Sequence, residues 1–169
     1  LCVLDATGTI KSVEDLRGKT VGATGQGSTP EYIFRYILKE NGIDPDKDIN
    51  LVFYTEHAEL ATRMATGEVE IGMLPEPNVT TTLTKNAKLV KALDLTEEWK
   101  KIAPNSALVQ GCIVARTEFI EKYPDSVKDF LKEYNASVEY VKTSEDAPEI
   151  IAELGIVPAA AVAKKALPN

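Results

Sequence analysis

The stretch from Gly18 to Tyr32 restricts the fold of this chain more than any other part of the sequence. Thr20 to Thr24 is a short β-prone run. Gly25 and Gly27 follow it, so the backbone there can turn and approach another molecule closely. Pro30 suits the first turn of a helix, because the N–H that proline lacks would have no partner there. The stretch therefore predicts a strand, a glycine loop and a helix N-terminus, a sequence of elements typical of α/β domains.

The same loop has two interpretations. Ser28 and Glu31 have the spacing of a capping box, which would make the loop a strand-to-helix turn and no more. The other N–H groups of the helix start would face a glycine-lined opening, which attracts anions and polar acceptors. No Gly-Lys-Ser/Thr closes the loop, so it is not a Walker phosphate-binding loop. No third glycine follows at the required spacing, so it is not the dinucleotide-binding fingerprint either.

Hydrophobic periodicity continues the alternation of strands and helices. Apolar residues at helical spacing predict helices over 30–41 and 56–66, the second ending at Gly67. Shorter helices are expected from Val79 and over 97–102. Apolar or alternating runs predict strands over 1–4, 49–54, 69–73 and 89–93. This order indicates βαβ units and a largely parallel sheet.

The pattern changes in the last third of the chain. Residues 108–115 have the pattern of a long strand broken by Gly111, and the chain is almost wholly helical from Phe119 onward. The long helix predicted over 124–143 carries an apolar stripe, which needs a further sheet to cover it. No remaining strand of this chain can form that sheet. The chain also starts without methionine inside an apolar run, so we expect it to be a fragment of a longer protein.

Composition excludes several functional classes. The formal net charge of −7 over 169 residues argues against holding nucleic acid or an anionic membrane by charge. No apolar run approaches the ~18 residues of a membrane helix. The two cysteines, Cys2 and Cys112, form no CxxC and His57 is the only histidine, so we expect no structural metal and no cofactor. Sequence leaves open whether these two cysteines pair in a disulfide.

Three segments together resemble a known family. They are the strand and glycine loop of 18–32, the strand followed by Glu-Pro over 67–77, and the run 111–131 with its return strand and first C-terminal helices. In this order they are similar to substrate-binding proteins of ABC transporters, in the group for nitrate, sulfonates, taurine and thiamine precursors. The resemblance extends over nearly the whole chain, although no single motif is diagnostic.

The resemblance implies an α/β fold of the type II periplasmic-binding-protein class. In this fold two α/β lobes are joined by crossing strands, and the ligand is held between the lobes. Residues 10–108 would form one complete second lobe, 1–9 and 109–116 the hinge or crossing strands, and 117–169 the C-terminal helices of the first lobe. The first half of the first lobe would be missing.

The resemblance also implies a function. The protein would be the extracytoplasmic solute-binding component of an ABC importer, periplasmic or anchored as a lipoprotein, and monomeric when intact. It would catalyse no reaction, and it would deliver a small polar molecule to a membrane permease. Two alternatives stay open: an enzyme of the same fold, such as a pyrimidine-precursor synthase, and a ligand-sensing domain of a signalling protein.

The candidate binding residues follow from the rule that ligands bind at the carboxyl ends of strands in open α/β sheets, and from the resemblance. Glu76 stands between two prolines, where a carboxylate can accept from an amine or amide. Ser28, His57 and Glu76 each have a structural alternative, as cap, helix start or surface residue. The three predicted loops contain no arginine, which favours a ligand with a donor group. The candidates are Thr24, Gly25, Gln26, Gly27, Ser28, Thr29, Glu56, His57, Glu76, Gln110 and Cys112.

Overall fold

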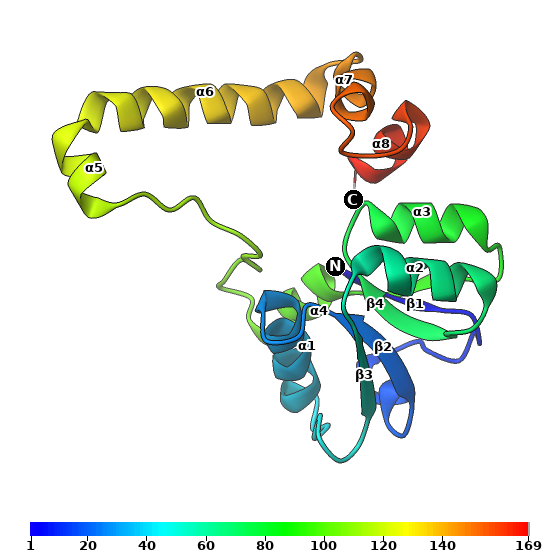
Figure 1. The fold of residues 1–169 in the computed structure, drawn as a ribbon. Helices are drawn as coiled ribbons and strands as arrows, with labels where there is room; N and C mark the ends of the chain where they lie inside the picture. The colour runs from blue at the N-terminus through cyan, green and yellow to red at the C-terminus, as the bar shows by residue number, and fades with distance from the viewer. Residues whose placement is uncertain (169) are drawn as a thin grey trace. The chain divides into compact units, whose positions relative to one another are not determined.

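The structure is a computed structural model that describes residues 1–168. The chain divides into two compact units, Leu1–Gln110 and Gly111–Asn169. The first unit is a sheet flanked by helices, and the second is built of helices alone (Figure 1). Within the described residues no helix is both long and apolar enough to cross a membrane.

The first unit is organised around a five-stranded sheet with the order β3-β2-β4-β1-β5. Its strands are β1 (Cys2–Asp5), β2 (Thr20–Thr24), β3 (Asn50–Tyr54), β4 (Ile71–Leu74) and β5 (Val90–Asp94). Strand β2 pairs in parallel with β3 and with β4, whereas β1 pairs antiparallel with β4 and with β5. Four strands therefore run one way and β1 runs the other. The sheet is mixed rather than largely parallel, because β1 enters between β4 and β5 against their direction.

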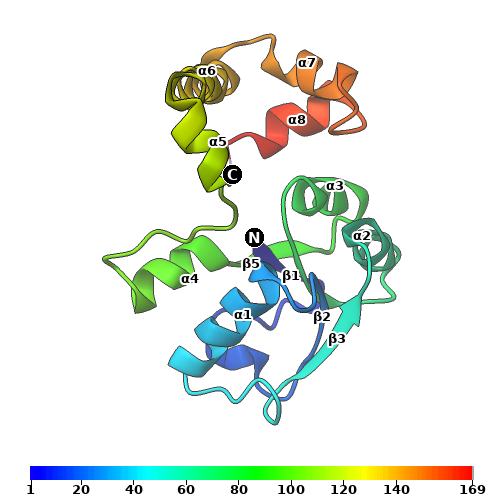
Figure 2. The ribbon, with the colours of Figure 1, turned by 60° about the vertical axis from the view of Figure 1, so that its left-hand side comes forward.

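Helices cover both faces of this sheet (Figure 2). They are α1 (Thr29–Glu40), α2 (His57–Thr66), α3 (Asn78–Lys85) and α4 (Leu95–Ile102), and a 3-10 turn covers Val13–Leu16. Neighbouring residues of β1 show how the two faces are separated. Val3 belongs to the apolar cluster that includes Phe34 of α1, and Leu4 belongs to the cluster that includes Leu60 of α2. Both clusters are formed entirely by residues of the first unit.

Local sequence explains where these helices begin and end. Pro30 lies in the first turn of α1, as predicted. Gly67 ends α2 in the left-handed conformation, with φ of 83°, also as predicted. The predicted helix over 97–102 starts two residues earlier, because the Asp94 side chain accepts from the N–H of Thr96 at 2.9 Å and caps α4.

The second unit contains α5 (Thr117–Lys122), α6 (Pro124–Thr143), α7 (Ala147–Glu153) and α8 (Ala160–Ala166). Helix α6 has the predicted bounds, and the other helices agree with the mainly helical pattern predicted from Phe119 onward. Its buried apolar residues are small and few, among them Ala147, Val157 and Ala163. Helix α6 buries no residue, and the side chain of Phe130 on its apolar stripe is 53% exposed. The apolar stripe predicted from sequence is present, and the described residues of the second unit leave it uncovered.

The strand predicted over 108–115 is absent, and that prediction was wrong. The segment from Ala103 to Arg116 has no regular helix or strand, and Val114 is 83% exposed. A β-strand needs the backbone of a neighbouring strand to satisfy its N–H and C=O groups, and none pairs with this segment. Its assignment as a crossing strand therefore stays a proposal.

Candidate functional site

Three loops meet at one edge of the sheet. Strand β2 lies between β3 and β4 and runs parallel to both, so their carboxyl ends share this edge. The edge carries residues 24–29 after β2, 55–57 after β3 and 75–77 after β4. Because β1 runs the other way, its first residues reach the same edge: Cys2 pairs with Leu74 and with Asp94. Sheet topology thus brings together most of the candidate residues.

A direct contact joins two of these loops. Thr24 Oγ1 lies 2.6 Å from His57 Nδ1. Thr24 is buried at the end of β2, and His57 is half-buried as the first residue of α2. The hydroxyl can donate or accept in this contact, depending on the tautomer of the ring. The structure therefore holds the His57 ring at the edge by its Nδ1 atom.

The glycine loop has a different geometry from the predicted capping box. The Ser28 hydroxyl donates to the Gly25 carbonyl at 2.6 Å, and no side-chain cap bond joins it to the helix. Glu31 accepts from the Gly27 N–H at 2.7 Å and not from Ser28. Gly25 and Gly27 both have φ of 72°, and this turn places the Gly25 carbonyl beside the Ser28 hydroxyl. The capping-box prediction was therefore wrong, although Ser28 is still the N-cap residue by backbone position.

The loop presents its polar groups to solvent. Gln26, Gly27, Ser28 and Thr29 are all exposed. Beside them lies a hollow of about 280 Å³ that belongs wholly to the first unit. Its lining residues are Gly25, Gln26, Phe53, Tyr54 and Thr55. Backbone and side-chain polar groups thus stand next to two aromatic side chains, which is the mixture found in sites for small molecules.

The two candidate glutamates are placed differently. Glu56 is exposed and occupies the N-cap position of α2, where its carbonyl accepts from Leu60. Glu76 is half-buried, and its Oε2 accepts from the N–H of Thr80 at 3.2 Å. Glu76 therefore stabilises the first turn of α3, a structural role that differs from the surface position weighed from sequence. This bond uses only one of its carboxylate oxygens.

The last two candidates lie outside this group of loops. Gln110 is exposed at the end of the first unit, and Cys112 is exposed in the second unit. Their roles in binding remain predictions. Both cysteines are free thiols, so the disulfide left open by sequence is not formed. Burial is the largest influence on the Cys2 thiol and raises its pKa, which keeps that thiol protonated and unreactive.

Sequence reasoning missed the buried carboxylate of Asp5. It accepts from the N–H and hydroxyl of Thr7 at 2.7 and 2.6 Å and from the N–H of Ile10 at 3.0 Å. Burial acts to raise the pKa of this carboxyl, but the bonds from Thr7 and Ile10 outweigh it and hold the pKa below its usual range. Asp5 ends β1, at the edge opposite the loops, so its role is structural. The sequence pattern that could have predicted this turn is an Asp followed two residues later by Thr, because an Asp side chain often accepts from the backbone two residues on.

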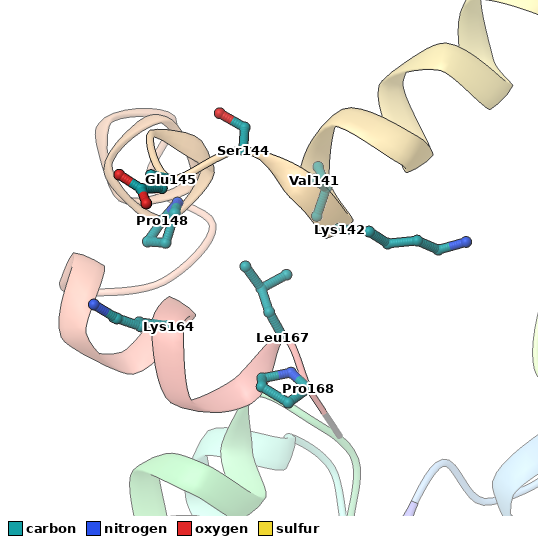
Figure 3. Close-up of a pocket in the computed structure, with 8 residues that line it drawn as sticks. All are labelled: Val141, Lys142, Ser144, Glu145, Pro148, Lys164, Leu167 and Pro168. Carbon is teal, nitrogen blue, oxygen red and sulfur yellow. The ribbon is translucent and has the colours of Figure 1, made fainter.

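A larger hollow, of about 690 Å³, lies within the second unit (Figure 3). It is bordered by the end of α6 and by residues around α7 and α8. The lining residues are Val141, Lys142, Ser144, Glu145, Pro148, Lys164, Leu167 and Pro168. Figure 3 shows the Lys142 side chain extending away from the others, and its Nζ bonds Glu139 at 2.9 Å. No group of three metal-ligating side chains occurs among the described residues.

Comparison with protein families gives one match that extends over most of the chain. Residues 4–156 match the model of the NMT1-like family. Among curated proteins, the putative binding protein YtlA of Bacillus subtilis is 36% identical over 64 residues, which are 38% of this chain and 19% of that protein. The nitrate import ATP-binding protein NrtC of Synechocystis is 27% identical over 156 residues, or 87% of this chain and 22% of that protein.

Solved structures share the fold. The aliphatic sulphonate binding protein SsuA of Escherichia coli has a TM-score of 0.78 at 18% identity, covering 98% of this chain and 53% of that one. The alkanesulfonate-binding protein SsuA of Xanthomonas axonopodis, bound to MOPS, has a TM-score of 0.65 at 16% identity, with 98% and 54% covered. An ABC transporter protein of Parabacteroides distasonis has a TM-score of 0.66 at 19% identity, and the match covers 98% of this chain and 55% of that one. The chain spans about half the length of these structures.

Proposed function

This chain belongs to the NMT1-like family, and from that membership and the geometry of its sheet edge we propose that it is part of a solute-binding protein of an ABC importer. In this proposal residues 10–108 form the second lobe, 1–9 and 109–116 the hinge, and 117–169 the C-terminal helices of the first lobe. The protein acts outside the cell membrane, catalyses no reaction and delivers its ligand to a permease.

One observation carries the proposal: the loops after three parallel strands converge on a single edge, linked by Thr24 and His57 at 2.6 Å. Parallel strands place their carboxyl ends together, and this is where open α/β sheets bind ligands. Exposed hydroxyl and amide groups of Gln26, Ser28 and Thr29 lie on this edge. The first lobe, facing this edge of the second lobe, would enclose a small polar molecule between the two lobes, and closure would occur about the hinge segments.

The charges on this edge favour a ligand with a hydrogen-bond donor, such as an amine. Residues 24–29, 55–57 and 75–77 contain no arginine or lysine, and two of these loops contribute a carboxylate, Glu56 and Glu76. A purely anionic ligand would find no cationic side chain in these three loops. Within the family group, this favours taurine and thiamine-precursor-like molecules over nitrate.

A thermal-shift screen of the protein together with its first lobe tests this proposal. The panel contains taurine, alkanesulfonates, nitrate, bicarbonate, pyrimidine amines and amino acids. A ligand at ~100 times its dissociation constant stabilises the fold by about 2.7 kcal/mol, which moves the melting temperature measurably. A dose-dependent shift with an amine-bearing compound supports the proposal. A shift with inorganic anions alone contradicts the ligand class, and a flat panel on folded protein contradicts the proposed binding role for these compounds.

A further inference from the structure

We propose that Glu31 is a positioning residue of the candidate site, whose carboxylate holds the glycine loop in shape through the N–H of Gly27. This inference rests on the proposed function only for its effect on binding. Glu31 was not among the candidates from sequence, where its spacing from Ser28 indicated a capping box. The structure gives its side chain a different partner, inside the loop that is expected to touch the ligand.

Each oxygen of the Glu31 carboxylate has its own partner. Oε2 accepts from the Gly27 N–H at 2.7 Å, and Oε1 accepts from Arg35 Nε at 2.6 Å. Arg35 Nη1 in turn bonds Asp46 Oδ1 at 2.7 Å. Glu31 is buried, with 9% of its surface exposed. These bonds tie the loop after β2 to the body of α1 and to the turn that follows it.

The carboxylate stays ionised in this position. The Gly27 N–H is the largest influence on its pKa and lowers it, burial acts in the opposite direction, and Arg35 lowers it further. Hydrogen bonds to an ionised acceptor are shorter and stronger than neutral ones. A charged side chain therefore holds a loop that would otherwise be free to move.

The loop needs such a bond because of its glycines. Gly25 and Gly27 lack a Cβ, so the unbound loop has many backbone conformations of similar energy. Fixing one of them before the ligand arrives reduces the entropy that binding must overcome. The bond also has a direct consequence for recognition: the Gly27 N–H is already occupied by Glu31. An acceptor on the ligand must therefore use other donors of the loop.

A matched control exists on α2, which lies on the opposite face of the sheet from α1. Glu59 and Arg63 of α2 repeat the same i,i+4 pairing, with Arg63 Nε 3.1 Å from Glu59 Oε1. Arg63 also pairs with a second acid, Glu68, as Arg35 pairs with Asp46. Among the described residues, the Glu59 side chain accepts from Arg63 and from no loop N–H. Glu59→Ala therefore removes the same kind of ion pair without touching the glycine loop.

The first experiment is independent of any ligand. Amide hydrogen exchange of Gly27 is measured by NMR in the chain and in Glu31→Ala, Glu31→Gln and Glu59→Ala. We expect exchange at Gly27 to be at least about tenfold faster in Glu31→Ala, since a bond to a charged acceptor is lost. Glu31→Gln, which keeps an acceptor oxygen, should restore part of the protection. Unchanged Gly27 exchange in Glu31→Ala, or an equal change in Glu59→Ala, would overturn the proposal.

The second experiment measures binding in the protein with its first lobe. Taurine and MOPS are the probes, and urea unfolding of each variant separates affinity from stability. For a probe that binds the parent protein, we expect Glu31→Ala to raise Kd about tenfold, Glu31→Gln to raise it less, and Glu59→Ala to leave it unchanged. Equal Kd in Glu31→Ala and the parent would overturn the role of Glu31 in binding. If neither probe binds the parent protein, this result contradicts amine-bearing sulfonates as the ligands, while Gly27 exchange still decides whether Glu31 holds the loop.

Discussion

Asp5 illustrates at the scale of one residue how a charge can be buried and still stabilise a fold. Its carboxylate is fully buried and accepts three hydrogen bonds from Thr7 and Ile10. The pKa of this carboxyl is lower in the folded protein than its value of ~3.9 in the unfolded chain. Its contribution to stability is therefore present above the unfolded-state pKa and is lost as the pH falls through the folded-state pKa. The structural role of Asp5 therefore has a characteristic dependence on pH.

We expect Asp5→Asn to lower the free energy of unfolding by about 2 kcal/mol at neutral pH, because one acceptor oxygen is replaced by a donor amide. The difference from the parent should shrink as the pH falls below about 4, where the parent loses its own carboxylate. Urea unfolding across this range measures both values. Asp125→Asn is the control, since the Asp125 side chain is 91% exposed. A loss of unfolding free energy in Asp5→Asn that does not change with pH would contradict the role of the ionised carboxylate.

The pairing of Thr24 with His57 gives a second prediction at this scale. Thr24→Val removes the hydroxyl that contacts Nδ1 of the half-buried His57 ring. We expect a loss of about 1 kcal/mol in unfolding free energy, and Thr24→Ser, which keeps a hydroxyl, should recover most of it. Urea unfolding of the three proteins measures this. Equal stability of Thr24→Val and the parent would show that the contact contributes nothing to the fold.

At the scale of elements, close packing between α2 and the sheet depends on glycine. A Cβ at Gly22 of β2 would lie 2.7 Å from Leu60 Cδ1, and Leu60 is fully buried. We expect Gly22→Ala to destabilise the first unit by roughly 1–3 kcal/mol, because α2 must move away from the sheet. Gly111→Ala is the control, since nothing lies within 4 Å of a Cβ built there. Thermal unfolding measures both, and a neutral Gly22→Ala would contradict this packing.

Helix α6 gives the opposite case, an element whose apolar face is left uncovered by the described residues of the second unit. Phe130 and Tyr134 stack at 6.0 Å between ring centroids, and both rings are about half exposed. We expect Phe130→Ser to change the stability of this chain by less than about 0.5 kcal/mol and to lower its binding of an apolar fluorescent dye. Urea unfolding and dye fluorescence measure the two effects. A large loss of stability would show that Phe130 is packed.

At the scale of the whole molecule, the two units differ in how far each supplies its own core. Both apolar clusters of the sheet are formed by residues up to Leu108, and the segment from Ala103 to Arg116 has no regular helix or strand. Proteases cut exposed, irregular backbone before they cut packed elements. We expect trypsin to cleave first after Arg116 and to release residues 1–116 with their folded structure retained.

Mass spectrometry over a digestion time course measures this, with circular dichroism of the released fragment. Arg116→Gln is the control and should delay the first cut without altering later ones. Early cleavage at Arg35 or Arg63, which lie within α1 and α2, would contradict the division into units. Loss of structure in the fragment would show that the first unit depends on the second.

Much of this architecture was readable from local patterns. Apolar spacing predicted α1, α2 and α6 nearly to their ends, and Gly67 and Pro30 marked helix boundaries, because these signals act between residues a few positions apart. The rule about strand ends predicted that the loops after β2, β3 and β4 lie together, and the sheet places them at one edge, while their role in binding stays a prediction. Periodicity also predicted the apolar stripe of α6, which the structure leaves exposed.

Tertiary structure decided the features that depend on distant partners. The direction of β1, the absence of a strand over 108–115 and the pairing of Thr24 with His57 each depend on which backbone or side chain lies alongside, and a single sequence does not state this. The partner of the Glu31 side chain also differs from the one that local sequence predicted. Its spacing from Ser28 matched a capping box, but two glycines with positive φ turned the Gly27 N–H toward its carboxylate. Local patterns determined most of the helices and the strands of the sheet, because their signals act within a few residues. Contacts between residues far apart in the chain determined whether the run 108–115 forms a strand and how the strands and loop side chains are paired.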